Sequence, residues 1–116
     1  MKTLFVLNDG PYGSERSYNG LRLGLALAKR EGHEVRVFLI GDAVGCAVRG
    51  QTTPNGYYNI ERMVAAIAQR GGTVGCCGSC CDARGVTDDM RAAGARRSSM
   101  DELVDWTLWA DKVVTF

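Results

Sequence analysis

Four of the five cysteines lie within six consecutive residues, 76–81, in the order Cys-Cys-Gly-Ser-Cys-Cys. Cys77 and Cys80 form a C-x-x-C pair at the end of a predicted strand. A thiolate is the reactive form of cysteine for nucleophilic attack and for accepting sulfane sulfur. A second thiol three residues away can resolve a persulfide or a mixed disulfide. The spacing therefore predicts thiol chemistry, with Cys77 as the catalytic nucleophile and Cys80 as the thiol that assists it.

Five further residues are candidates for binding around this pair. Ser79 lies between the two thiols and offers a hydrogen bond to sulfur, while Arg84 supplies a cation that favours a thiolate. Asp9 and Asp42 follow two other predicted strands, where each is either a base toward a thiol or a structural group. Cys46 falls in a long predicted loop and either approaches the cysteine cluster when this loop closes over it or packs in the core.

The cysteine cluster is also compatible with a packing role or with metal binding. Cysteine is a small hydrophobic residue, so the cluster can simply cap a strand. Zinc normally takes four ligands, often from two well-separated C-x-x-C pairs. The chain has no second pair, and its one histidine, His33, is predicted at the opposite end of a strand, so a metal would have to be shared between subunits. We therefore expect no bound metal. We also expect no bound cofactor, because residues 10–14 match neither glycine-rich phosphate-binding motif.

The hydrophobic pattern alternates between short apolar runs and helical spacing. Since such alternation is typical of parallel strands joined by crossover helices, it predicts a three-layer α/β/α fold with a five-stranded, mostly parallel sheet, flavodoxin- or Rossmann-like, in a single domain over 1–116. Ligands bind outside the carboxyl ends of such strands. The segments 8–13, 41–56 and 76–85 lie there, and they contain all five cysteines. Strands are predicted at residues 3–7, 34–40, 73–76, 95–98 and 112–116, and helices at residues 14–30, 57–70, 86–93 and from 99 to about 110.

Local signals refine this assignment. Ser14 is a plausible N-cap of the first helix, and Ser99 with Glu102 matches a capping box. Residues 43–56 are predicted to form a long loop, of the kind that often serves as a lid or binding loop. The first helix is apolar on two faces, and the last helix carries Trp106 and Trp109, which favours self-association.

Composition excludes several classes of protein. The 116 residues include fourteen basic and thirteen acidic side chains, for a net charge of +1. No basic stripe supports a nucleic-acid or membrane partner, and the apolar runs are too short for a spanning helix or a secretory signal. We therefore expect a cytoplasmic protein with reduced cysteines rather than a disulfide framework.

The chain resembles the DsrE/DsrF-like family of small sulfur-handling proteins, and within it the YchN-like branch. The resemblance covers essentially the whole chain and is carried by residues 8–16, 19–23, 41–44, 54–59, 77–85, 99–103 and 110–113. It implies the fold described above and assembly into homotrimers or homohexamers. In the better-understood branches it implies sulfur transfer as a cysteine persulfide, in sulfur oxidation or tRNA thiolation. The sulfur-carrying cysteine there lies eight residues before the glycine of an Arg-Gly pair, which corresponds to Cys77 counted from Gly85. Cys80 has no required counterpart in the relay branches, and Cys76 and Cys81 are extra.

Three hypotheses for function follow. The first is a small cytosolic protein that carries sulfane sulfur as a persulfide on Cys77, receiving it from a donor protein or a small persulfide and passing it to an acceptor. It would be a sulfurtransferase-like carrier at most. The second is a thiol–disulfide redox or sensing protein that uses Cys77 and Cys80. The third is an oligomeric module that binds a small ligand or metal without catalysis.

Overall fold

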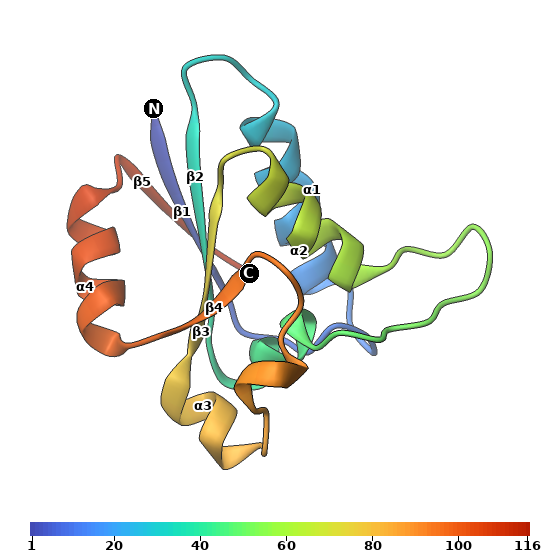
Figure 1. Ribbon diagram of the computed structural model, residues 1–116. Helices are drawn as coiled ribbons and strands as arrows, with labels where there is room; N and C mark the ends of the chain where they lie inside the picture. The colour runs from blue at the N-terminus through green and yellow to red at the C-terminus, as the bar shows by residue number, and fades with distance from the viewer.

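The computed structural model describes residues 1–116 and contains five parallel strands and four α-helices (Figure 1). The strands lie in the order β4-β3-β2-β1-β5, and every neighbouring pair is parallel. No helix has the length and apolar character that a membrane span would need. The elements are β1 (Lys2–Leu7), α1 (Arg16–Ala28), β2 (Glu34–Leu39), the 3-10 helix η1 (Gly41–Ala47), α2 (Ile60–Gln69), β3 (Thr73–Cys77), α3 (Gly78–Ala83), the 3-10 turn η2 (Asp88–Met90), β4 (Ala95–Ser98), α4 (Met100–Trp109) and β5 (Lys112–Thr115).

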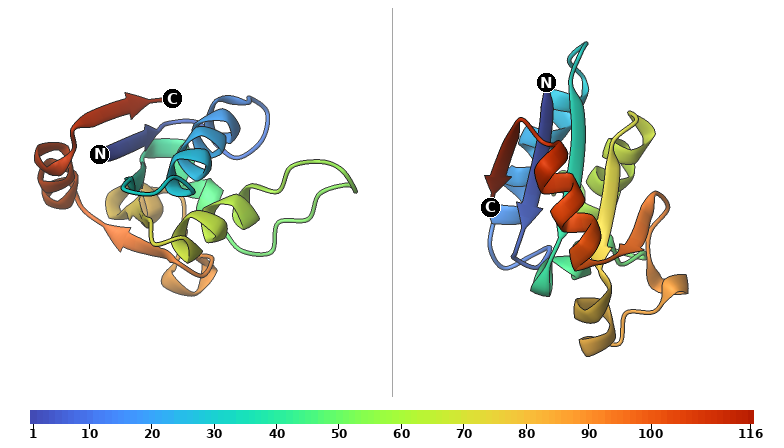
Figure 2. Two further views of the ribbon diagram at one scale, coloured as in Figure 1. Left: turned by 90° about the horizontal axis from the view of Figure 1, so that it is seen from above. Right: turned by 90° about the vertical axis from the view of Figure 1, so that its left-hand side faces the viewer.

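Helices cover both faces of the sheet, which confirms the predicted α/β/α architecture. α1 and α2 lie together on one face and α4 lies on the other, as Figures 1 and 2 show. The central strands are buried between these layers, and Leu4, Phe5 and Phe38 are fully inaccessible. Continuous apolar strands are expected where a parallel sheet is covered on both sides. The sheet is entirely parallel rather than mostly parallel.

Helix boundaries differ from the prediction at two places because the capping residues are different. α1 begins at Arg16 after Glu15, and the hydroxyl of Ser14 instead donates a hydrogen bond of 2.6 Å to Asp9. α2 begins at Ile60, since the side chain of Asn59 accepts from the N–H of Arg62 and caps the helix there. Residues 57–59 therefore precede the helix.

Two segments predicted as loops are helical at the carboxyl end of the sheet. η1 occupies the first part of the predicted lid, and its Val44 and Cys46 are fully buried. The cysteine segment is also not a loop, because α3 begins directly after β3. The helix predicted over residues 86–93 is wrong in extent, since only the three-residue turn η2 forms there.

The last helix presents one face to the sheet and another to solvent. Ser99 caps α4 as predicted, but the carboxylate of Glu102 bonds to Ser98 and Arg96 rather than completing the capping box. Trp106 is 4% exposed and packs edge-on against Phe38, so it cannot serve as a surface contact for another subunit. The exposed apolar residues of α4 are instead Met100, Val104 and Leu108, and on α1 only Leu23 is strongly exposed.

Candidate functional site

The central feature of the site is the junction between β3 and α3, at the bottom of the sheet in Figure 1. Cys77 is both the last residue of β3 and the N-cap of α3, and it is 7% exposed. The N–H groups of the first helical turn lack partners within the helix and are available to a group at this position. The N–H groups of Ser79 and Cys80 both stabilise the ionised Cys77 sulfur, and the Ser79 hydroxyl lies 3.4 Å from it.

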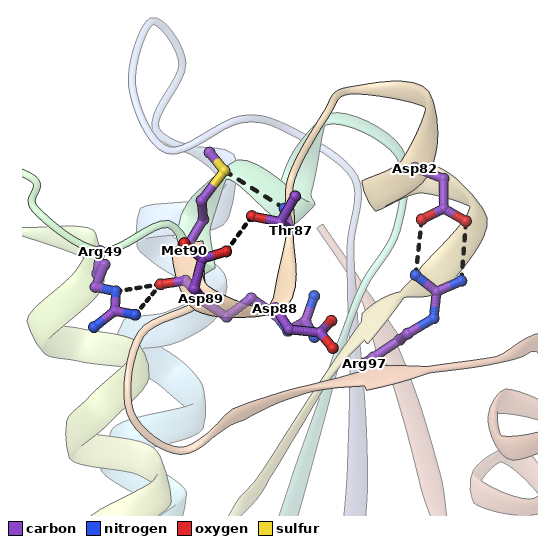
Figure 3. Close-up of polar contacts among 8 residues, drawn as sticks. Arg49, Asp82, Thr87, Asp88, Asp89, Met90 and Arg97 are labelled. Carbon is purple, nitrogen blue, oxygen red and sulfur yellow. Dashed lines mark hydrogen bonds and ion pairs between the residues drawn. The ribbon is translucent and has the colours of Figure 1, made fainter.

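The close approach of an arginine explains the glycine that follows Cys77. A Cβ atom on Gly78 would lie 2.8 Å from Cζ of Arg97. Arg97 itself forms a two-pronged ion pair with Asp82 over distances of 2.8 and 2.9 Å. This pair joins β4 to the last turn of α3 and so holds the helix against the sheet (Figure 3).

Cys77 is the one cysteine whose pKa lies below its ordinary value. Burial opposes ionisation, but hydrogen bonds from Cys80 and Ser79 and from their backbone N–H groups outweigh it and lower the pKa of Cys77. The pKa values of the other four cysteines are raised, chiefly by burial. Cys77 is thus the thiol best suited to act as a nucleophile near neutral pH.

Cys80 lies beside Cys77 and is half-buried. Its sulfur accepts a hydrogen bond of 3.2 Å from the N–H of Gly41, at the start of η1. Burial and the neighbouring Cys77 raise the pKa of Cys80, which keeps it protonated and able to donate to the Cys77 thiolate. Sequence reasoning missed Gly41, because a backbone contact between segments 39 residues apart carries no residue-type signal.

Arg84 does not lie against Cys77, contrary to the expectation that its charge stabilises that thiolate. Its Nε and Nη2 atoms donate to one carboxylate oxygen of Asp42 over 3.0 and 2.9 Å, and its Nη1 donates to the carbonyl of Cys80. The pair links the end of α3 to η1. The Asp42 side chain is 77% exposed and that of Arg84 is 38% exposed, so solvent screens the pair and it stabilises the fold by less than about 1 kcal/mol.

Asp9, which follows β1, and Cys46, which lies in η1, form a group of their own apart from the contacts of Cys77. The Asp9 carboxylate accepts from Ser14, and its carbonyl accepts from Ser17 and lies 3.6 Å from the Cys46 sulfur. Cys46 is fully buried, and burial raises its pKa to about 12. Of its two predicted alternatives, the structure shows packing in the core.

Cys76 and Cys81 are also fully buried, and burial raises the pKa of Cys76 to about 12. No group of three or more His, Cys, Asp or Glu side chains converges with the geometry of a metal site. A second residue that the sequence did not single out is Arg91, whose side chain is only 7% exposed and which lies near Cys76 and Cys81.

The fold and this junction together define a small parallel α/β protein with a thiol of lowered pKa at the carboxyl end of an inner strand. The chain belongs to the DsrE/DsrF-like family, whose model matches residues 1–116. It is 40% identical to Protein YchN of Escherichia coli K12 over 116 residues, covering 99% of this chain and 98% of that protein. The crystal structure of the E. coli YchN protein superposes with a TM-score of 0.93, covering 100% of this chain and 99% of the other.

A more distant relative carries a name that refers to chemistry. "Putative sulfurtransferase DsrE" of Allochromatium vinosum is 28% identical over 129 residues, which covers 100% of this chain and 98% of that protein. The resemblance inferred from the sequence motifs is therefore confirmed at the level of the family and the fold.

Proposed function

We propose that the protein carries sulfane sulfur as a persulfide on Cys77. The observation that carries this proposal is the contrast among the five thiols, of which Cys77 alone has a lowered pKa, at the carboxyl end of β3. The name of the A. vinosum relative supports the same chemistry. Donor and acceptor proteins are the proposed partners.

The transfer step needs no change in overall oxidation state. The Cys77 thiolate attacks the terminal sulfur of a donor persulfide, the donor S–S bond breaks, and the donor leaves as a thiolate. The hydrogen bonds from Ser79 and Cys80 stabilise the Cys77 anion before the attack. An acceptor thiolate then removes the terminal sulfur in the same manner, which restores Cys77.

The contact between Cys77 and Cys80 favours a second candidate function, thiol–disulfide exchange. The Cys80 thiolate would attack the inner sulfur of a Cys77 persulfide, releasing hydrosulfide and forming a Cys77–Cys80 disulfide. The name of the A. vinosum relative refers to sulfur transfer rather than to disulfide exchange, so we place the carrier function first.

Self-association into a homotrimer or homohexamer is also part of the proposal. α4 exposes Met100, Val104 and Leu108, which are spaced four residues apart and so form one apolar stripe. Leu108 is 81% exposed. A second copy of the chain covering this stripe would remove that apolar surface from water.

Mass spectrometry of the protein after incubation with inorganic polysulfide tests the carrier function. We expect the mass of added sulfur on the peptide that contains Cys77, and its loss in Cys77→Ser. Cys80→Ser is the informative comparison, because it retains the nucleophile and removes the resolving thiol. An adduct that persists undiminished in Cys77→Ser would refute the assignment, and a Cys77–Cys80 disulfide as the main product would favour thiol–disulfide exchange.

A further inference from the structure

A buried arginine lies behind the reactive junction and is not used by the proposed transfer step. Arg91 follows η2, and its side chain is 7% exposed. Its Nη2 atom pairs with the carboxylate of Asp88, but its Nη1 atom is buried and has no hydrogen-bond partner. Figure 3 shows Asp88 at the η2 turn, between Arg49 and the Asp82–Arg97 pair. Because buried polar groups are normally paired, the free Nη1 donor indicates that an acceptor belongs there.

The groups beside this guanidinium are thiols. Its charge lowers the pKa values of Cys81 and Cys76 against the stronger effect of burial, and it acts more strongly on Cys81, although Nη1 forms no hydrogen bond of regular geometry with that sulfur. Both cysteines are completely inaccessible. Cys81 is covered by the segment that leads to Arg91, because the N–H of Val86 donates to its carbonyl over 2.9 Å.

We propose that Cys81 is a second sulfur-carrying thiol, and that Nη1 of Arg91 receives the terminal sulfur of the persulfide formed on it. This inference rests on the proposed function of Cys77, which supplies the sulfur. A persulfide adds one sulfur atom beyond the Cys81 thiol and thereby provides an acceptor where the buried donor now lacks one. Hydrogen bonds between a cation and an anion are the stronger kind, so the arginine would hold the sulfur as an anion.

The route from Cys77 to Cys81 follows from the helix between them. Cys77 is the N-cap of α3 and Cys81 is the fourth residue of the helix, so the two lie about one helical turn apart. Both belong to the same packed core cluster, and the charge of Cys77 acts on the pKa of Cys81. Cys77 retains 7% exposure whereas Cys81 has none, so sulfur enters at Cys77.

The step balances without an oxidant or reductant. The sulfur of Cys81 attacks the terminal sulfur of the Cys77 persulfide, the S–S bond on Cys77 breaks, and a new S–S bond forms on Cys81. The proton of the Cys81 thiol goes to the Cys77 sulfur as it leaves. The products are a Cys77 thiol and a Cys81 persulfide.

Position-resolved mass spectrometry tests the second site. The protein is loaded with inorganic polysulfide, quenched with an alkylating reagent under denaturing conditions, and fragmented so that ions separate each cysteine from the next. Arg91→Met removes the charged group and keeps the aliphatic stem, while Arg91→Lys retains the charge. Arg96→Met is the matched control, because Arg96 pairs with Glu102 and not with any thiol. Circular dichroism and thermal melting establish that each variant is folded.

We expect persulfide on both Cys77 and Cys81 in the unchanged protein. Cys77→Ser should abolish loading of Cys81, and Arg91→Met should lower Cys81 occupancy about tenfold while Cys77 still loads. Arg91→Lys should recover part of this loss, and Arg96→Met should behave like the unchanged protein.

Persulfide confined to Cys77 would overturn the second site and leave the carrier function standing. Equal loading of Cys81 in Cys77→Ser would overturn the route. Absence of persulfide from both positions would refute the carrier function itself, so the two failures are distinguishable.

Discussion

Replacing Ser79 by alanine should raise the pKa of Cys77 and slow its reactions at neutral pH. The Ser79 hydroxyl lies 3.4 Å from the Cys77 sulfur, and its hydrogen bond is among the interactions that lower this pKa. The variant removes that donor while the backbone N–H groups of α3 remain.

The expected size of the effect follows from the strength of such a bond. A hydrogen bond to a charged group contributes about 1.5–3 kcal/mol, and a pKa shift of one unit corresponds to about 1.4 kcal/mol. Ser79 is itself exposed, which places its contribution at the lower end of the range. We therefore expect the pKa of Cys77 to rise by about one unit, and the thiolate fraction well below that pKa to fall about tenfold.

The assay is the rate of alkylation of Cys77 by iodoacetamide as a function of pH, followed on the peptide that contains it. Since the thiolate is the reacting species, the midpoint of the rate profile reports the pKa. Ser14→Ala serves as the matched control, because the Ser14 hydroxyl bonds to Asp9 in a different loop. An unchanged midpoint in Ser79→Ala, or an equal shift in Ser14→Ala, would contradict the assignment of the low pKa to local hydrogen bonds.

Three other predictions concern stability and assembly. Cys46 has an ordinary pKa of 9.0 that burial raises to about 12 in the folded state, so its contribution to stability is complete below pH 9 and is lost as the pH rises toward 12. The unfolding free energy should therefore fall as the pH rises above 9, and Cys46→Ala should make this fall less steep by about 1.4 kcal/mol per pH unit. Urea titration at several pH values above 9 measures the slope, and an unaltered slope in the variant would show that the Cys46 thiol does not control the pH dependence. Gly94→Ala should lower the unfolding free energy by about 2–5 kcal/mol, because the φ of Gly94 is +87° and the new Cβ would lie 2.4 Å from the Cβ of Ala68. Gly50→Ala is the control, since Gly50 has the same φ but open space around it, and it should lower the unfolding free energy by only about 1–3 kcal/mol. Equal losses in the two variants would rule out the clash with Ala68. Leu108→Glu should shift light-scattering mass toward the monomer if α4 forms the subunit contact, whereas an unaffected oligomer would place the interface elsewhere.

The strands could be predicted from the sequence because their burial between two helical layers requires apolar side chains. A strand covered by helices on both faces must be apolar at every position, and residues such as Leu4, Phe5 and Leu7 show this without any alternation. The N-cap at Ser99 was equally predictable, since its side chain acts on a backbone group three residues away. The location of the cysteines at the carboxyl end followed from strand direction alone.

The parts of the site that escaped prediction depend on contacts distant in sequence. α3 consists of six residues that include glycine, serine and two cysteines, which are weak helix formers. Its support comes from Arg97 on β4 and from the N–H of Gly41, neither of which the local pattern can indicate. Arg91 was missed for a different reason, because a charged residue close in sequence to two aspartates is normally assigned to the surface.

The change from strand to helix explains why adjacent cysteines differ in acidity. Cys76 still belongs to the strand and is enclosed by the core, whereas Cys77 occupies the point where the backbone N–H groups of the next turn become available. Cys81 lies one turn further on, where burial again dominates its pKa. Four thiols within six residues are therefore chemically distinct, because the position of the helix start determines which sulfur its N–H groups stabilise. Sulfur entering at Cys77 and resting at Cys81 would use both sides of that difference, a stabilised anion with 7% exposure for capture and a fully enclosed thiol beside Arg91 for storage.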